Sequence, residues 1–132
     1  MSRIPADAMY LLEGGHHANV ATLNADGSPQ VTPVWVGHEG DTVLINTARG
    51  RLKERNLARD PRVSIAVSDT EDPTKALLIR GRVMEITEDG ADEHIDALAK
   101  RYLGTDEYPF RQPGEVRVRI LIHPEKATFS GG

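Results

Sequence analysis

The sequence contains no cysteine, which excludes disulfide bonds, a thiolate nucleophile and cysteine-ligated zinc or iron–sulfur sites. It also lacks an apolar run near the roughly 18 residues that a membrane span needs, and its first residues lack the apolar core of a signal peptide. We therefore expect a cytoplasmic protein that has no membrane partner. Its 132 residues fit one domain, residues 1–132, and leave no room for a two-domain oxidoreductase or a full (β/α)8 barrel.

An excess of positive charge is missing as well. The chain carries 16 lysines and arginines against 20 acidic residues, a formal charge of -4, which argues against a uniformly basic nucleic-acid binder. The charge is unevenly distributed. Residues 49–62 hold six basic and two acidic residues, whereas the rest of the chain holds ten basic and eighteen acidic ones. Positive charge is thus concentrated where an anion would bind.

Turn residues and hydrophobic periodicity divide the chain into short strands and three helices. A short helix is expected over residues 5–13, before Gly14 and Gly15, and another over residues 51–59, before Pro61. Apolar residues at helical spacing predict a longer helix over residues 90–103, with Gly104 as its end. Alternation and turn residues predict strands at 16–23, 30–37, 42–47, 62–68, 76–87, 116–122 and 126–130.

Short links between successive strands favour an antiparallel barrel over a parallel α/β sheet. We expect a mainly β fold, a six- to seven-stranded Greek-key barrel. Pro33 has no N–H to donate to a ladder, so its strand should be at an edge or carry a bulge there. Gly81, midway along a long strand, predicts a bend or a bulge. In the strand over 116–122, Arg117 and Arg119 are expected to point outward.

The basic segment lies where a strand gives way to a helix. Gly50 permits a tight turn there, and the unpaired backbone N–H groups and positive dipole end of the helix would face that turn. Arg51 and Lys53 fall in the first helical turn, where the dipole alone does not favour cations, so a bound phosphate would explain them. The alternative is a solvated basic face that pairs with the acidic remainder of the chain.

The same segment carries a family resemblance. The pattern T-x3-R-x-K-x2-N-L-x2-D-P-R, from Thr47 to Arg62, resembles the signature of the split β-barrel flavin and deazaflavin oxidoreductases of the pyridoxamine 5'-phosphate oxidase-like superfamily. Within it the sequence is most similar to actinobacterial reductases that depend on coenzyme F420. The pattern A-T-x3-D-G-x-P-x3-P-V, from Ala21 to Val34, supports the likeness, which covers nearly the whole chain.

The resemblance implies a homodimer with a cofactor site at the interface of its two copies. In such proteins the R-x-K pair holds the cofactor phosphate, the strand end adjoins it, and the ring system lies on the strand after the D-G-x-P turn. The partner copy completes the site with the region 76–79. The residues so implied are Arg51, Lys53 and Asn56, then Asn46, Thr47 and Ala48, then Thr32, Pro33, Val34 and Trp35, and finally Leu78 and Ile79.

Several of these residues also have plain structural explanations. Trp35, the single tryptophan, is either a core or interface residue or a wall of the cofactor or substrate pocket. Asn56 either bonds the strand end or stabilises the helix. Arg49 and Arg55 either reach an acidic cofactor tail or are solvated. Adjacent histidines, as at 16–17, point to opposite faces of a strand, so no metal site is expected.

The resemblance implies a reductase that transfers a hydride from reduced F420 to a small electrophilic organic acceptor. The alternatives are an FMN-binding flavoprotein of the same superfamily and a non-catalytic carrier of F420, flavin or a haem-like molecule. A dimeric scaffold with an unused basic patch is the plainest alternative. No catalytic side chain stands out, because the cofactor would perform the chemistry and the protein would bind and orient it.

Overall fold

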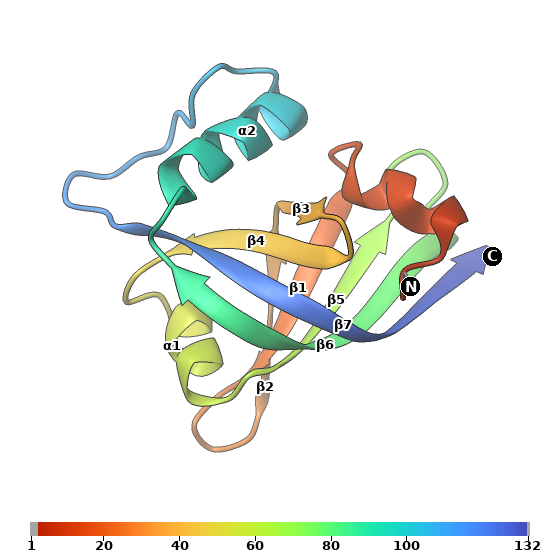
Figure 1. The fold of residues 1–132 in the computed structure, drawn as a ribbon, viewed down its shortest axis with the longest axis horizontal. Helices are drawn as coiled ribbons and strands as arrows, with labels where there is room; N and C mark the ends of the chain where they lie inside the picture. Colours follow the sequence, from red (N-terminus) through yellow and green to blue (C-terminus); the bar gives the residue numbers. More distant parts are fainter. Residues whose placement is uncertain (1–2, 132) are drawn as a thin grey trace.

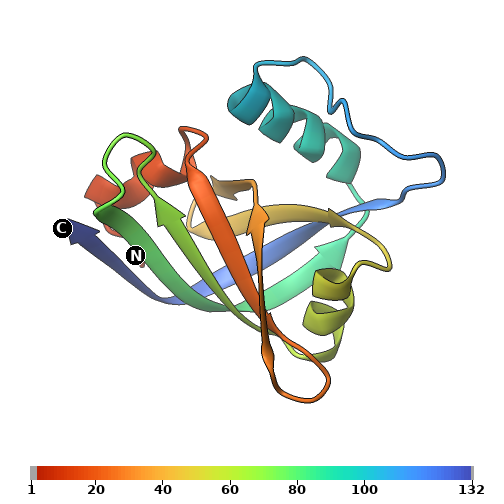
Figure 2. The ribbon, with the colours of Figure 1, turned by 180° about the vertical axis from the view of Figure 1, so that it is seen from behind.

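The computed structural model describes residues 3–131, which form one curled, antiparallel seven-stranded sheet with three helical segments (Figures 1 and 2). The sheet has the spatial order β2-β1-β5-β6-β7-β4-β3. Its strands are β1 (His17–Leu23), β2 (Pro29–Val34), β3 (Val36–Glu39), β4 (Thr42–Ala48), β5 (Arg62–Ser68), β6 (Lys75–Thr87) and β7 (Arg117–Gly131). The expected mainly β, antiparallel split barrel is confirmed.

The helical segments cover the openings of the curled sheet. The first, η1 (Ala6–Leu12), is a 3-10 helix rather than an α-helix, and it buries Ala8, Leu11 and Leu12. Helix α1 (Leu52–Arg59) links β4 to β5, and α2 (Ala91–Leu103) follows β6. A long loop leads from α2 back to β7, so α2 and this loop stand together at one end of the sheet (Figure 1).

Two expected divisions of the chain into strands are wrong. The strand expected over 30–37 is broken at Trp35 into β2 and β3, which lie at opposite edges of the sheet. The strands expected over 116–122 and 126–130 are one strand, β7. Pro124, which lies between those two expected strands, pairs with Gly81 beside a register shift. The missing proline N–H therefore falls where the ladder is already irregular.

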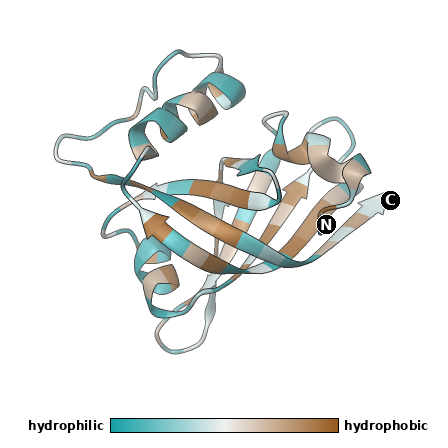
Figure 3. Cartoon of the chain, in the orientation of Figure 1, coloured by the Kyte–Doolittle hydropathy of each residue, from teal (hydrophilic) through white to brown (hydrophobic). Residues whose placement is uncertain are grey.

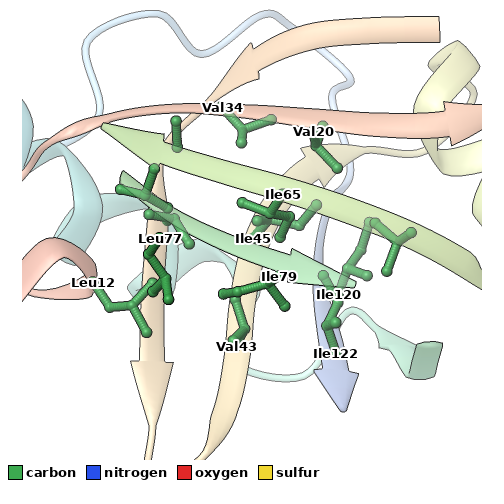
Figure 4. Packing of buried hydrophobic residues seen from close by; sticks show 14 of the residues in the cluster. Leu12, Val20, Val34, Val43, Ile45, Ile65, Leu77, Ile79, Ile120 and Ile122 are labelled. Atoms are coloured by element: carbon green, nitrogen blue, oxygen red, sulfur yellow. The ribbon is translucent and has the colours of Figure 1, made fainter. Parts of the chain in front are cut away.

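The core lies inside the curl of the sheet. Aliphatic side chains from most of the strands and from η1 point toward one another there (Figure 4), and the hydropathy colouring concentrates the most hydrophobic residues along the strands (Figure 3). Each such large side chain contributes on the order of 1.5–3 kcal/mol by leaving water. Fully buried examples are Leu12, Val20, Val43, Ile45, Leu77, Ile120 and Ile122. This packing fixes β4 and β7, the two strands that carry the polar site described below.

The expectations for Pro33 and Gly81 are confirmed. Pro33 lies in β2, at one edge of the sheet, and pairs with Asn19 of β1. Gly81 adjoins a register shift between β6 and β7, and a Cβ atom there would collide with the backbone carbonyl oxygen of His123. Glycine is thus required at this bend by close backbone approach.

Replacing Gly81 with alanine is expected to destabilise the protein by about 1–3 kcal/mol, because the colliding atom is backbone and cannot turn aside. Chemical denaturation measures the loss. Gly131→Ala, in the same pair of strands, is the matched control, because no atom of residues 3–129 lies within 4 Å of a Cβ at Gly131. Equal stabilities of the two variants would contradict the packing at Gly81.

Candidate functional site

A pocket of about 210 Å³ lies between the strand end of β4, the start of α1 and the loop that follows α2. Both charged groups and aromatic rings line this pocket. Its lining residues are Pro33, Val34, Trp35, Asn46, Arg51, Lys53, Ile95, Tyr108, Phe110 and Arg117. The pocket therefore combines the edge strand that contains Pro33 with the basic strand-to-helix turn.

Three cations converge on this pocket, namely Arg51, Lys53 and Arg117. Glu115 bridges the two arginines: one carboxylate oxygen is 3.1 Å from Nη2 of Arg51, and the other is 3.1 Å from Nη1 of Arg117. The Glu115 side chain is buried. With one carboxylate against three cations, this cluster carries a net charge of about +2 when Lys53 is protonated, which suits a phosphate group.

Lys53 is electrostatically strained by this arrangement. Its ammonium group is half-buried, and the pKa of Lys53 is lowered first by this loss of water and then by the charges of Arg51 and Arg117. A bound anion would relieve both effects, because it would replace lost hydration and offset the repulsion between like charges. The cluster thus fits an anionic ligand better than it fits an empty, solvated face.

The turn before α1 differs from the expected open helix terminus. Gly50 has a φ of 88°, as the tight turn requires, but its N–H donates to the Glu54 carboxylate at 2.8 Å. The N–H of Arg51 donates to the Ala48 carbonyl. Two of the expected backbone donors are therefore already used, and side-chain cations provide the positive charge of the pocket.

Most other basic residues of the 49–62 segment have protein partners. Arg49 pairs with Glu88 at 3.2 Å and lies 3.9 Å from Glu54. Arg62 pairs with Asp60 at 2.7 Å, and this contact lowers the pKa of Asp60 to about 2. Arg59 donates to the Leu23 carbonyl. Of these contacts, only the pair with Glu88 lowers the local charge of +4, because Asp60 is already counted in it and a carbonyl carries no net charge.

The aromatic wall is built around Trp35, the residue between β2 and β3. Its ring stacks on Tyr102 of α2 with centroids 5.3 Å apart, and it meets the edge of Tyr108 at 5.8 Å. Tyr108 in turn contacts Phe110, which is exposed. Trp35 is therefore both packed against a helix and part of the pocket wall, so the two interpretations of this residue are compatible.

The structure brings together only part of the predicted site. Pro33, Val34, Trp35, Asn46, Arg51 and Lys53 line the pocket, whereas the remaining predicted residues do not. Thr47 and Ala48 are buried beside it in β4, and Asn56 is fully buried, with its amide donating to Thr22 and Asn24. Thr32 precedes the pocket residue Pro33 in β2, and its hydroxyl is buried without a hydrogen-bond partner among the described residues.

Leu78 and Ile79 lie on β6, away from this pocket. The side chain of Leu78 is exposed on the outer face of the sheet, where it lines a separate hollow of about 440 Å³. Ile79 is in the core and is only 3% exposed. Within one chain neither residue reaches the cations, so their predicted role requires a second copy.

The family model described as Pyridoxamine 5'-phosphate oxidase matches residues 4–131. The chain belongs to this family. An F420 reductase of known structure is 29% identical, with a TM-score of 0.82 and coverage of 95% of this chain and 98% of that one. A conserved hypothetical protein from Mycobacterium tuberculosis is 23% identical, with a TM-score of 0.74 and coverage of 98% and 88%. General Stress Protein 26 from Bacillus anthracis is 20% identical, with a TM-score of 0.68 and coverage of 92% and 88%.

Membership of the family accounts for the fold, whereas the pocket of this family member has residues that sequence patterns did not assign to a cofactor site. Arg117 was expected to point outward, but it is buried, at 5% exposure, and lines the pocket. Ile95 lines it from α2. Strand alternation misplaces Arg117 because this residue begins β7, where Val118 is buried as well.

Two kinds of feature are absent from residues 3–131. No group of three or more histidine, cysteine or acidic side chains gathers there in a way that could hold a metal ion. Within the same residues, no helix has the length and apolar character needed to cross a membrane.

Lys53→Met is expected to stabilise the ligand-free protein at neutral pH and low salt, because it removes a half-buried charge next to two arginines. Because the pKa of Lys53 is lower in the folded than in the unfolded protein, the free energy of unfolding of the wild-type protein rises with pH between these two pKa values. The variant has no ammonium group at this position, so this rise should be absent from it. Thermal unfolding between pH 7 and 10 measures both effects. Lys75→Met, at an exposed position in β6, is the control; a less stable Lys53→Met would contradict the repulsion.

Proposed function

We propose that the chain is an oxidoreductase that binds coenzyme F420 and reduces a small electrophilic organic acceptor. The observation that carries the proposal is the convergence of Arg51, Lys53 and Arg117 beside the exposed edge strand at Pro33. The 29% identical F420 reductase supports the deazaflavin over other cofactors of the family, because it matches nearly the full length of both chains.

The residues of the pocket fit a cofactor that bears a phosphate. Arg51, Lys53 and Arg117 would hold the phosphate, since they exceed the charge of their bridging carboxylate. Pro33, Val34 and Trp35 would face the ring system. When bound, reduced F420 supplies a hydride to the acceptor. Tyr108 and Phe110 would then exclude water from the acceptor side of the pocket and orient the acceptor.

FMN is the second candidate, because it also has a phosphate and the three cations do not distinguish the two cofactors. F420 has an acidic tail that FMN lacks. Arg49, one of two cations expected near such a tail, is paired with Glu88, whereas Arg55 is exposed on α1. Arg55 is thus the better candidate for a tail contact.

We further propose that the active form is a homodimer. The single-chain pocket of about 210 Å³ is smaller than the roughly 300–1,000 Å³ of typical ligand sites. The outer face of the sheet presents a second, mainly apolar hollow, lined by Ala21, Val31, Ala66 and Leu78 among others. Val31 and Leu78 are 63% and 49% exposed. A second copy would bury these side chains and complete the cofactor site.

Fluorescence titration in parallel with F420 and FMN tests the cofactor. Tighter binding of F420 is expected, and Lys53→Ala should weaken it by about 1–3 kcal/mol, or roughly 5- to 150-fold, through loss of a charge-assisted contact. Lys75→Ala is the matched control, and it should bind like the wild-type protein. Unchanged affinity in both Lys53→Ala and Arg51→Ala would contradict the site. Binding without turnover of enones, quinones or nitroaromatics would instead support the carrier alternative.

The dimer is tested by Leu78→Lys, which places a charge on the apolar outer face. Light scattering after gel filtration should give twice the mass of one chain for the wild-type protein and a single-chain mass for the variant, with weaker F420 binding. Met84→Lys changes another exposed apolar residue of β6 that does not line the hollow. A wild-type monomer, or a Leu78→Lys dimer with full affinity, would argue against a shared site.

A further inference from the structure

The side chain of Asn46 makes three hydrogen bonds within the protein. It lies in β4, is 8% exposed, and connects α2 with the pocket. Its amide nitrogen is 2.9 Å from the carbonyl oxygen of Ala91 and 3.0 Å from Nδ1 of His94. Its oxygen accepts from Nε of Arg117 at 2.9 Å. Both amide N–H groups are therefore used, and the oxygen has one of its two acceptor sites filled.

The chemistry of these partners fixes the orientation of the amide. A backbone carbonyl can only accept, so the NH₂ group of Asn46 must face Ala91. A guanidinium can only donate, so the oxygen of Asn46 must face Arg117. Nδ1 of His94 then has to accept, which places the ring proton on Nε2 and leaves the ring neutral.

The surroundings of His94 favour the same neutral state. Burial, followed by the charges of Arg119 and Arg117 on β7 and of Arg101 on α2, lowers the pKa of His94 to about 4. At neutral pH, Nδ1 of His94 is therefore available to accept a hydrogen bond from the amide of Asn46. Protonation of His94 at Nδ1 would place its N–H against the N–H of Asn46, and the hydrogen bond between the two side chains would be lost.

Arg117 is held on three sides. Asn46 binds its Nε, Glu115 binds its Nη1, and the Tyr108 ring lies 5.0 Å from its guanidinium carbon. Among residues 3–131, no hydrogen bond involves Nη2 of Arg117, although this arginine lines the pocket. The guanidinium is thus fixed in orientation while one edge is left for a ligand.

We propose that Asn46 is a positioning residue, which with His94 orients Arg117 so that its remaining N–H groups meet an anion in the pocket. The sequence resemblance implies a direct role for Asn46 at the cofactor, but both of its amide N–H groups and one acceptor site of its oxygen are used inside the protein. The inference rests on the anion-binding pocket of the proposed function and does not depend on which cofactor carries the anion.

Asn46→Leu, which branches at the same carbon as asparagine but has no polar group, tests this role. Inorganic phosphate is titrated into the wild-type protein and the variant, with NMR detection of the Arg117 Nε–H signal. The wild-type signal should be protected from exchange and should shift on phosphate binding. The variant should lose the protection and bind phosphate about 5- to 10-fold more weakly. Val43→Ala, a core change in the same strand, is the control for destabilisation and should retain both properties.

A second variant tests the amide orientation without removing the acceptor for Arg117. Asn46→Asp cannot donate to His94, so His94 should take up a proton at Nδ1, which nitrogen chemical shifts of the ring report. The wild-type ring should show the proton on Nε2 at neutral pH. A wild-type proton on Nδ1 would overturn the inference, as would equal phosphate affinity in the wild-type protein and Asn46→Leu, or an equal loss in Val43→Ala.

The cofactor titrations separate this inference from the proposed function. If neither F420 nor FMN binds while phosphate binds and Asn46→Leu weakens it, the proposed function fails and the positioning role stands. If F420 binds but Asn46→Leu has no effect on phosphate, the positioning role fails alone. If phosphate does not bind the wild-type protein, the positioning role fails, and the cofactor titrations alone decide the proposed function.

Discussion

The arrangement of the pocket depends on the burial of one guanidinium. Removing the charge of Arg117 from water is costly unless protein groups replace its hydration shell. Those groups come from separate parts of the chain: Asn46 from β4, and Glu115 and Tyr108 from the loop between α2 and β7. Solvating Arg117 therefore fixes the loop against the sheet, and the pocket is the space that remains beside it.

The same requirement sets the charge balance of the site. Glu115 neutralises one positive charge and bridges two arginines, while Lys53 is left partly buried without a carboxylate among its described contacts. The ligand-free protein thus holds an unfavourable excess of positive charge. Anion binding is therefore favoured both by the contacts that the anion makes and by the relief of repulsion between the cations.

The sequence contains enough local information for most of the fold and for about half of the site. Pro33 indicates an edge and Gly81 a bend, because each constrains the backbone by itself. The R-x-K pair is recognisable because it follows a strand and a tight turn. In contrast, Arg117 and Arg119 are chemically alike and two residues apart, yet only Arg117 is fully buried. Its burial depends on Asn46, 71 residues away, and no local pattern records that partner.

The boundary between β2 and β3 shows the same limit. Periodicity describes residues 30–37 as one strand, and only the closure of the sheet separates them at Trp35. Likewise, the charge excess of residues 49–62 is visible in the sequence, but its reduction by Glu88 is not, because that acid follows β6. Local propensity therefore predicts elements, while pairing over long distances decides which charges remain for a ligand.

The junction at Trp35 has a consequence for aggregation. An open sheet exposes two edges, and each can recruit strands from other molecules into fibrils. Here the two edge strands are consecutive in the chain and separated by one residue, so both edges begin at the same point. One of them contains Pro33, which offers no N–H, and the other is only four residues long and ends at Glu39. The two sheet edges that meet beside the pocket are therefore poor templates for strand addition by other molecules.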